Sequence, residues 1–350
     1  MIRQSMADSE PFKQWLRTYL PARLLGESVE LQPVSGDAGF REYFRVNCTP
    51  SMLLAYAPPE TENNTGFVTI GRALARAGVH TPRVYAVDFQ RGYFIQEDLG
   101  QELYLGALNN QTLGPLYDCA EASLLKIQQV PAQQDIFPLY SAERLREELE
   151  LFPQWFVTEL LGHELSSEEQ KMLDQLFDQL VDSALEQPQV VVHRDFHSRN
   201  LLVLPEQDVG VIDFQDAVVG PCTYDLVSLL RDCYVRWPEA LVNARVSGFL
   251  HKAKAAGLIR DDLEQSTYLG WFDLMGLQRH IKVLGIFARL YLRDAKPAYL
   301  RDLPLVIRYT LEVAPSYPQS RDFCQWFLET LEAPLLEQSW YQDWTQAGEL

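Results

Sequence analysis

The sequence predicts an α+β fold with two lobes, a small β-rich N-terminal lobe and a large, mainly helical C-terminal lobe. Short β-type runs gather before residue 100, helical periodicity dominates the rest, and a small group of strands interrupts the helices near residue 200. A chain of 350 residues also exceeds what one hydrophobic core usually holds. We therefore expect an N-terminal lobe at residues 1–99 and a C-terminal lobe at residues 100–350.

The N-terminal lobe begins with an amphipathic helix that Ser9 can cap. Its apolar residues fall on one face: Phe12, Trp15, Leu16, Tyr19 and Leu20. Runs rich in β-branched and aromatic residues follow, bounded by turn residues, at 29–34, 40–46, 51–57, 83–89 and 92–98. A helix at 66–78 separates the third run from the fourth. Such an order is typical of an antiparallel sheet with one inserted helix.

The C-terminal lobe contains a helix at 166–187 that opens with a capping box, Ser166 and Glu169, and stops before Pro188. Three short strands are expected at 189–193, 201–204 and 209–213, and a long helix at 261–294. The connection between the lobes lies near Gly100. A cleft is expected there, because small-molecule sites usually form between domains.

The charge composition limits the kinds of partner that the chain is expected to bind. Thirty basic residues against 48 acidic ones give a formal charge of −18, which repels nucleic acid and acidic membranes. Solubility is the simplest reading of this charge, although an acidic surface could also attract a cationic substrate. No apolar run approaches the roughly 20 residues that span a bilayer, and no segment suggests a protein partner.

The compartment expected is the cytoplasm. The first residues, MIRQSMADSE, contain no apolar stretch of the secretory type. The cysteines are odd in number and scattered, which favours free thiols over disulfides or a zinc site. They are Cys48, Cys119, Cys222, Cys233 and Cys324.

The strongest chemical signal is the pair of segments HRDFHSRN (193–200) and VIDF (211–214). Asp195 can act as the base that accepts a hydroxyl proton. Asn200 and Asp213 offer oxygen ligands to Mg²⁺, and a hairpin between them would bring both to one end. The spacing matches the kinase pattern H-R-D-x-x-x-x-N followed by D-F-G, with Gln215 in place of the glycine. The alternative is that these are ordinary turn residues.

Two N-terminal segments could hold ATP. The loop in SGDAGFREYFRV (35–46), with Ser35, Gly36 and Gly39, could fold over phosphates and offer backbone N–H groups. It lacks the third glycine of the kinase loop and also suits any hairpin. The segment FIQEDLG (94–100) could pair with adenine through backbone groups near Glu97 and Leu99, or could be a strand that ends in a turn.

With these residues the sequence resembles the aminoglycoside phosphotransferase and choline kinase superfamily. HRDFHSRNLLV, VIDFQDAVVGPCTYDLVSLLRDCYV and QEDLG carry this resemblance. Within it the chain most resembles the N-acetylmuramate/N-acetylglucosamine kinases, through GDAGFREYFRV, LAYAPPE, GVHTPRVYAVD and GLQRHIKVLGIFARL, over about residues 30–310. The resemblance implies a bilobal protein-kinase-like fold and phosphorylation of the anomeric hydroxyl of amino sugars in peptidoglycan recycling.

The same resemblance implies roles for single residues. Asp195 is the catalytic base, with Asn200 and Asp213 as Mg²⁺ ligands. Asp225 braces the catalytic loop, and His193 gives it structural support. His197 could donate to the transferred phosphate or could simply pack.

A protein kinase is disfavoured, because the segment after Asp213 runs directly into a helix and is too short for an activation segment. Arg194 would have no phosphorylated loop to hold. This shortness leaves the acceptor site open to a small molecule.

The N-terminal lobe departs from the kinase pattern in one respect. Kinases of this fold hold the phosphates with a third-strand lysine paired to a helix glutamate, whereas this chain has no lysine between Lys13 and Lys126. Tyr56 stands near the expected position. Either Arg41 or Arg45 substitutes, or nucleotide binding depends on the loop backbone and the metal.

Substrate residues are expected on the helix that carries Arg279, His280 and Lys282. Arginine suits the lactyl carboxylate of a muramic acid, so Arg279 or His280 could face the cleft; otherwise they form a solvated helix face. Arg231 is a second candidate. Asp216, near the metal ligand, could bind sugar hydroxyls or shape its loop.

Other functions stay open from sequence alone. A kinase of an aminoglycoside, a choline-like amine or homoserine would need an acidic cleft. A nucleotide-binding pseudokinase that acts as a regulator would explain the missing lysine.

Overall fold

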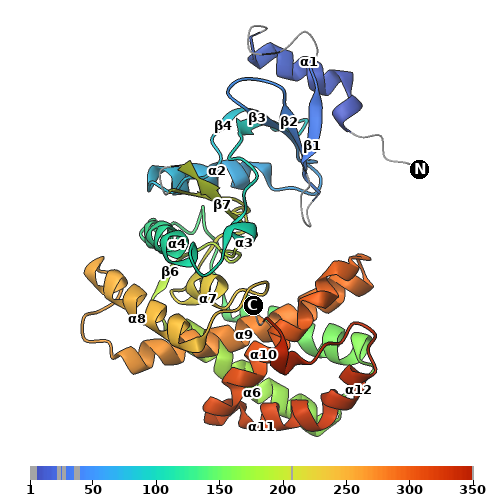
Figure 1. The fold of residues 1–350 in the computed structure, drawn as a ribbon, viewed down its shortest axis with the longest axis vertical. Coiled ribbons are helices and arrows are strands. Elements are labelled where there is room, and N and C mark those ends of the chain that lie inside the picture. The colour runs from blue at the N-terminus through green and yellow to red at the C-terminus, as the bar shows by residue number, and fades with distance from the viewer. Residues whose placement is uncertain (1–5, 22–24, 26–28, 35–39, 206–207, 349–350) are drawn as a thin grey trace. The chain divides into compact units, whose positions relative to one another are not determined.

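The computed structural model describes residues 6–21, 25, 29–34, 40–205 and 208–348. The chain forms two compact units, one comprising Met1–Ser123 and Asn200–Asp216 and the other Leu124–Arg199 and Ala217–Leu350 (Figure 1). The expected lobe boundary after residue 99 stays a prediction, since compactness alone does not define which residues bind a nucleotide. Within the described residues, every helix is too short or too polar to be a membrane span.

A five-stranded antiparallel sheet, in the order β1-β2-β3-β5-β4, forms the base of the first unit. Its strands are β1 (Leu31–Val34), β2 (Glu42–Val46), β3 (Met52–Tyr56), β4 (Val84–Asp88) and β5 (Tyr93–Glu97). Helix α2 (Asn64–Arg76) lies between β3 and β4 in the chain. The predicted strands and the inserted helix are therefore confirmed.

Helix α1 (Glu10–Tyr19) closes the hydrophobic core of this unit. Phe12, Trp15 and Leu16 join the cluster that also contains Phe44 and Tyr93 of the sheet. Tyr19 lies on the same side of the helix as Trp15, as predicted, but 53% of its surface is exposed. Its ring covers only the edge of the core, at 5.0 Å from the ring of Trp15. Ser9 stands at the N-cap, but its side chain makes no capping hydrogen bond.

A β-hairpin places the two motif ends together in the first unit. Strands β7 (Leu201–Leu204) and β8 (Asp208–Val211) pair with Leu201 opposite Val211. One step beyond this pair, the Ile212 N–H donates to the Asn200 carbonyl at 3.1 Å. The predicted hairpin is confirmed, and Asn200 and Asp213 both lie at its end.

Helices make up most of the second unit. Helix α4 (Leu113–Gln128) begins in the first unit and ends in the second. The others are α5 (Ala142–Leu149), a π-helix at Phe152–Leu160, α6 (Ser167–Glu186), α7 (Tyr224–Leu230), α8 (Glu239–Ala255), α9 (Gln265–Leu292), α10 (Leu303–Val313), α11 (Arg321–Trp326) and α12 (Glu332–Leu336). The capping box of Ser166 and Glu169 at the start of α6 is confirmed.

The sequence analysis missed one strand of the second unit, β9 (Val218–Pro221), which lies between Asp213 and α7 in the chain. Strand β6 (Gln189–Val192) pairs with β9, antiparallel and with Val192 opposite Val218. The chain after Asp213 therefore forms this short strand before α7 begins, rather than passing directly into a helix. The pair holds the start of HRDFHSRN against the segment that precedes Asp225.

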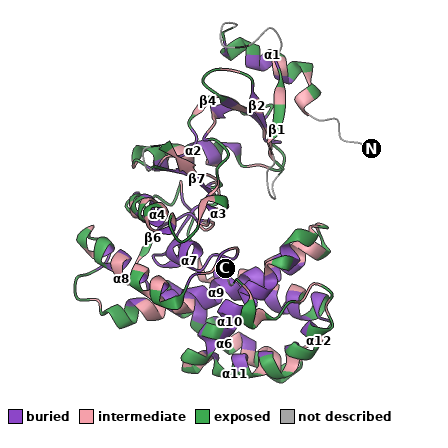
Figure 2. Ribbon diagram, viewed as in Figure 1, coloured by how far each residue is buried: buried purple, intermediate pink, exposed green. Residues whose placement is uncertain are grey.

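Helix α9 occupies the core of the second unit. All its residues from Met275 to Gly285 are buried, including the polar Gln278, Arg279, His280 and Lys282 (Figure 2). A Cβ at Gly285 would lie 2.6 Å from the Phe152 backbone nitrogen and would also strike the Leu151 carbonyl group. Backbone cannot withdraw as a flexible side chain can, so only glycine fits this crossing.

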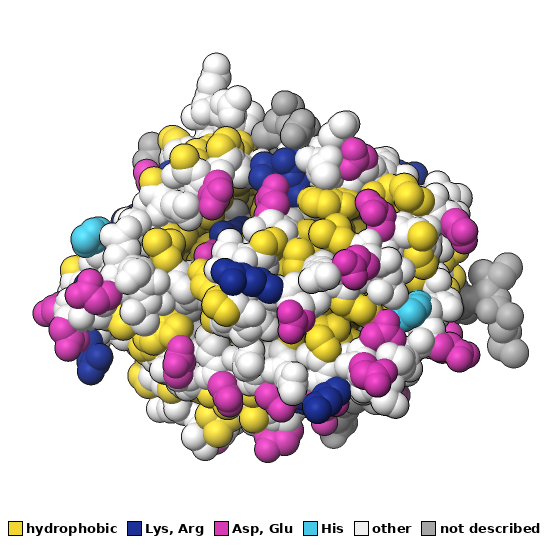
Figure 3. All heavy atoms as spheres, turned by 90° about the horizontal axis from the view of Figure 1, so that it is seen from below, with side chains coloured by type: hydrophobic (Ala, Val, Ile, Leu, Met, Phe, Trp, Pro, Cys, Tyr) yellow, Lys and Arg dark blue, Asp and Glu magenta, His cyan; other side chains and the backbone are white. Residues whose placement is uncertain are grey.

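Surface charge follows the composition. On the face drawn in Figure 3, acidic side chains are scattered among polar and hydrophobic ones instead of gathering in one patch. This distribution fits the reading of the net charge as a solvated surface.

We predict opposite effects for two alanine substitutions in α9. Gly285→Ala should destabilise the protein by about 1–3 kcal/mol, because the new methyl group overlaps backbone at Leu151 and Phe152. Gly270→Ala, at a position where a Cβ meets nothing within 4 Å, should stabilise it by up to about 1 kcal/mol through helix propensity. Urea denaturation measures both, and equal effects would contradict the packing at Gly285.

Candidate active site

The loop after β6 is held by one carboxylate. Asp225, fully buried in α7, accepts hydrogen bonds from the backbone N–H of His193 at 2.7 Å and of Arg194 at 2.9 Å. Burial raises the pKa of Asp225 to about 7, against the effect of these two donors. His193 is also buried, and its ring nitrogen Nδ1 accepts from the Asp195 N–H at 3.2 Å. Both residues named for structural support therefore contact the backbone that carries Asp195.

Arg194 has an unusual backbone conformation, with φ at 78°. A positive φ at a residue other than glycine costs free energy and persists where the surroundings determine it. Here the surroundings are the Asp225 carboxylate and a largely buried ion pair between Arg194 and Glu148 of α5. Arg194 thus has an internal partner and needs no phosphorylated loop.

Glu148 is the centre of a largely buried polar cluster. Besides Arg194 it pairs with Lys282 of α9, whose ammonium lies 2.8 Å from a Glu148 oxygen. Lys282 also donates to the hydroxyl of Tyr224 at 3.0 Å, and the Tyr140 hydroxyl donates to Glu148. Burial alone would raise the pKa of Glu148, but the charges of Lys282 and Arg194 outweigh it and lower that pKa. We call these five residues the Glu148 cluster.

Asp195 is ionised at neutral pH in this environment. Burial acts to raise the pKa of its carboxyl group, but electrostatic interactions with His197, Lys282 and Arg194 outweigh burial and lower the pKa. A carboxylate that stays charged yet lies among cations can orient a hydroxyl group and accept its proton.

Tyr234 supports the remainder of the loop. The His197 ring meets the Tyr234 ring edge to face at 5.3 Å, and the Arg199 guanidinium lies 3.6 Å from the centre of the same ring. Arg199 also approaches Asp302 at 3.5 Å. Asp232 accepts from the backbone N–H of Ser198 at 2.9 Å. The segment after α7, through Asp232 and Tyr234, therefore holds the HRDFHSRN loop in place.

In the first unit, the structure brings Asn200 and Asp213 together. The Asn200 amide lies 3.4 Å from one Asp213 carboxylate oxygen, and the Gln215 amide donates to the other at 2.7 Å. Asp213 has φ at 63°, so each of the two segments HRDFHSRN and VIDF contains one residue other than glycine with a positive φ. Carboxylate and amide oxygens are ligands that Mg²⁺ prefers, so this pair fits that ion.

Arg41 stands out among the candidates for the missing lysine. Its Nε lies 3.0 Å from Glu62, just before α2, and its guanidinium covers the Phe67 ring at 4.1 Å. Only 8% of the side chain is exposed. Nε is ion-paired with Glu62, yet neither Nε nor Nη2 is aligned for a hydrogen bond with any of the described residues. Burial raises the pKa of the neighbouring Tyr43 hydroxyl. The charge of Arg41 acts to lower that pKa, and the charge of Asp213 acts to raise it further.

Arg45 has a different environment. It binds Asp98 through Nε at 2.5 Å and Nη2 at 2.9 Å, and Ser51 donates to the same carboxylate. The Asp98 carboxylate also accepts from the Gly100 N–H at 3.1 Å. Arg45 thus fixes the turn that follows β5.

The expected adenine segment lies at this turn. Leu99 is buried, and the Glu97 side chain accepts from the Arg83 N–H at 3.2 Å and approaches His80 at 3.6 Å. The loop residues Ser35, Gly36 and Gly39 lie outside the described residues.

The basic residues expected at the substrate are buried. His280 has no exposed surface, stacks on Tyr309 at 4.9 Å, and has its pKa lowered to about 3 by burial and by Arg279. Arg279 donates to the Cys233 thiol at 3.3 Å, and Arg231 pairs with Asp273 at 2.7 Å. The alternative of a solvated helix face is therefore wrong, because α9 presents these groups to the core. Asp216 is exposed.

Sequence reasoning missed Glu148, Tyr234 and Glu62, and it named Lys282 as one of three basic residues on a helix without assigning it a role. Each acts through a partner far away in the chain, as Lys282 does with Glu148. The one available signal was a charged residue inside an apolar helix, and Lys282 in HIKVLG gave it.

The fold is the protein-kinase-like fold. The solved choline kinase from Cryptosporidium parvum is similar at a TM-score of 0.62 and 14% identity, covering 92% of this chain and 100% of that one. An ethanolamine kinase from Plasmodium vivax matches at a TM-score of 0.60 and 12% identity, covering 92% and 98%. An ADP-bound aminoglycoside phosphotransferase matches at 0.57 and 14% identity, covering 87% and 99%.

Sequence comparison defines the family. The model of the phosphotransferase enzyme family matches residues 30–258, and the chain belongs to this family. It is 42% identical over 320 residues to an N-acetylmuramate/N-acetylglucosamine kinase of Pseudomonas aeruginosa, covering 88% of this chain and 93% of that protein. A protein of the same name in Neisseria meningitidis is 36% identical over 313 residues, covering 88% and 91%. The resemblance found in the motifs is confirmed.

We predict that the Glu148 cluster depends on its single carboxylate. Glu148→Leu should lower the free energy of unfolding by about 3–5 kcal/mol, since Arg194 and Lys282 would remain buried without a counter-charge. Exposed Glu147, replaced by Gln, should change it by less than about 0.5 kcal/mol.

The pH dependence checks the same cluster. Because the folded-state pKa of Glu148 is lowered from 4.5, the stabilisation by its carboxylate is complete above that pH and is lost as the pH falls toward the folded-state pKa. The difference in stability between wild type and Glu148→Leu should therefore shrink in acid. A constant difference from pH 7 to pH 3 would contradict this assignment.

Proposed function

We propose that the chain transfers the γ-phosphoryl group of ATP to the anomeric hydroxyl of N-acetylmuramate or N-acetylglucosamine. The observation that carries the proposal is the 42% identity to the Pseudomonas aeruginosa kinase of that name across 88% of this chain. The cytoplasm, where ATP is held, is the proposed location.

Asp195 is proposed as the residue that acts on the acceptor. Its carboxylate accepts the hydroxyl proton as the acceptor oxygen bonds to phosphorus and the bond from phosphorus to the ADP oxygen breaks. The cations that lower the pKa of Asp195 keep it able to accept this proton at neutral pH. His197 is proposed to donate a hydrogen bond to the transferred phosphoryl group. The support is the edge-to-face contact with Tyr234, which holds the imidazole ring in place.

Asn200 and Asp213 are proposed to hold Mg²⁺. The support is their shared place at the end of the β7–β8 hairpin and the oxygen atoms that they offer. When bound, the ion neutralises phosphate charge. Gln215 keeps one Asp213 oxygen in place, which limits the rotation of this carboxylate.

Arg41 is proposed to replace the missing lysine, with Glu62 in place of the helix glutamate. A buried guanidinium with two unsatisfied nitrogens is costly unless a ligand completes its hydrogen bonds. Phosphate oxygens would do so, and an arginine can bind two of them at once. Arg45 is assigned to the turn at Asp98 instead.

The remaining contacts are proposed in outline. Adenine pairs with the backbone near Glu97 and Leu99, and the loop with Ser35, Gly36 and Gly39 covers the phosphates. Asp216, which is exposed, binds a sugar hydroxyl. The basic residues expected at the substrate are buried, so they are proposed to support the acceptor site from within the core rather than to contact the sugar: Arg231, Arg279 and His280.

We predict that Asp195→Asn lowers kcat about 10²–10⁴-fold, because the amide cannot accept the proton. ADP formation with Mg-ATP and each of the two amino sugars measures this. Asp182→Asn, at an exposed position of the same unit, is the matched control and should keep the wild-type kcat.

A panel of acceptors separates the alternatives. ADP formation with choline, homoserine or an aminoglycoside, and none with the amino sugars, would overturn the proposed substrate. Nucleotide binding without turnover on any acceptor would indicate a pseudokinase.

We predict that Arg41→Ala raises KM for ATP about tenfold or more, with a smaller effect on KM for the sugar. Arg41→Lys should recover part of the affinity, since it restores the charge but not the paired donors. Arg91→Ala, at an exposed turn, serves as the control. If Arg41→Ala lowered the melting temperature and left KM for ATP unchanged, Arg41 would be structural.

A further inference from the structure

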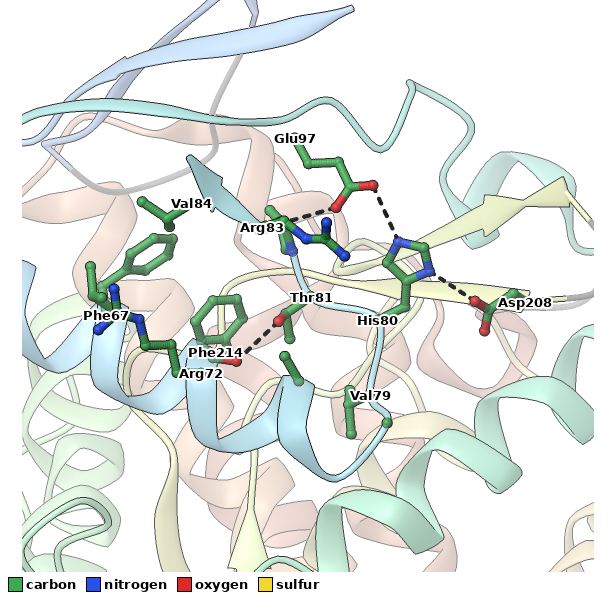
Figure 4. Close-up of a pocket in the computed structure, with 15 residues that line it drawn as sticks. Phe67, Arg72, Val79, His80, Thr81, Arg83, Val84, Glu97, Asp208 and Phe214 are labelled. Carbon is green, nitrogen blue, oxygen red and sulfur yellow. Dashed lines mark hydrogen bonds and ion pairs between the residues drawn. The ribbon is translucent and has the colours of Figure 1, made fainter. Parts of the chain in front are cut away.

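A cavity of about 460 Å³ lies within the first unit. Helix α2 lines it with Phe67, Val68, Gly71, Arg72 and Ala75, and the segment from Gly78 to Val84 forms another wall. Glu97, Asp208 and Phe214 complete the lining (Figure 4). This volume is within the usual range for small-molecule sites. Of the residues proposed to bind the nucleotide, Glu97 is among the described lining residues and Leu99 and Arg41 are not, so the cavity adjoins the proposed nucleotide site.

Its polar groups favour an anion. The two carboxylates are already engaged: Asp208 binds His80 Nδ1 at 2.8 Å, and Glu97 contacts His80 and the Arg83 N–H (Figure 4). Arg72 and Arg83 also line the cavity, and neither guanidinium forms an ion pair with any residue that the structure describes. The charges left to meet a ligand are therefore positive.

Its apolar groups favour an organic ligand. Figure 4 shows the Phe67 and Phe214 rings beside Arg72 at one end of the lining, with His80 and Arg83 further along. Val68 and Val79 are buried and add apolar surface. Inorganic anions would leave this surface without contact.

The walls of the cavity contact the proposed nucleotide site. Phe67 stacks on Phe214 at 4.9 Å and carries the Arg41 guanidinium on its ring at 4.1 Å. Phe214 follows Asp213 directly, and a Cβ at Gly71 would lie 3.0 Å from the Phe214 ring. A ligand that shifts either ring would move a residue proposed to bind phosphate or Mg²⁺.

We propose that this cavity is a second ligand site, which binds a small organic anion and changes nucleotide affinity through Phe67 and Phe214. The binding part stands on the cavity itself, and the coupling part rests on the proposed function.

Phenyl phosphate is a suitable probe, since it joins an anionic group to an aromatic ring. Calorimetric titration of the full chain, with Mg-ADP at saturation, should give 1:1 binding at least tenfold tighter than that of phenol or inorganic phosphate. Arg72→Ala or Arg83→Ala should weaken it at least tenfold. Arg76→Ala, on α2 but outside the lining, should not. Binding unaffected by both variants, or no binding, would overturn the site.

Coupling has its own measurement. Saturating phenyl phosphate should shift the Kd for Mg-ADP at least threefold to a plateau, and Mg-ADP should shift the Kd for the probe by the same factor. A shift that grows without a plateau would indicate competition, and no shift would overturn the coupling. The double variant of Arg72 and Arg83 should keep wild-type kinase activity without the probe. If the wild-type protein turned over neither amino sugar, the proposed function would be refuted and the binding result would still stand.

Discussion

The packing of the second unit depends on the ion pairs that the Glu148 carboxylate forms with Arg194 and Lys282. This carboxylate neutralises Arg194 on the HRDFHSRN loop and Lys282 in the centre of α9, so one charge connects the loop to this helix. Two buried cations near one another would repel, and each would also lose its hydration. With Glu148 between them, the same cations instead surround Asp195 and lower its pKa. Structural neutralisation and the preparation of Asp195 thus arise from the same residues.

The first unit has a comparable arrangement with a different outcome. The Glu62 carboxylate lies near Arg41 but leaves two guanidinium nitrogens without a hydrogen-bond partner among the described residues. In the Glu148 cluster each charged group has a close ion-pair partner, and of the Arg194 nitrogens Nε lacks a hydrogen bond among the described residues. The incomplete pairing of Arg41 is what a binding residue needs, because its remaining donors gain a partner only when an anion arrives.

Much of the fold could be predicted from the sequence, because local pattern determines it. The five strands of the first sheet, helix α2 and the capping box of α6 follow from periodicity and turn residues in their own segments. Strand β9 could not, since VVGP has a glycine and a proline and becomes a strand only by pairing with β6. The burial of Arg279 and His280 was hidden for a similar reason. Polar residues on a helix normally indicate a solvated face, and only partners such as Cys233 and Tyr309 make burial tolerable.

The candidate site divides along the same line. The motif spacing predicted that Asn200 and Asp213 meet, because a hairpin of fixed length joins them. It could not predict the strained backbone at Arg194 and Asp213, which depends on what holds each residue in place. Asp225 and Glu148 hold the first, and Gln215 contacts the second from two residues away. Both strained residues are next to or among the groups proposed for chemistry, and neither is glycine. A glycine at either position would relieve the backbone strain but would remove the side chain. The surrounding contacts must therefore offset the free-energy cost of the strained backbone.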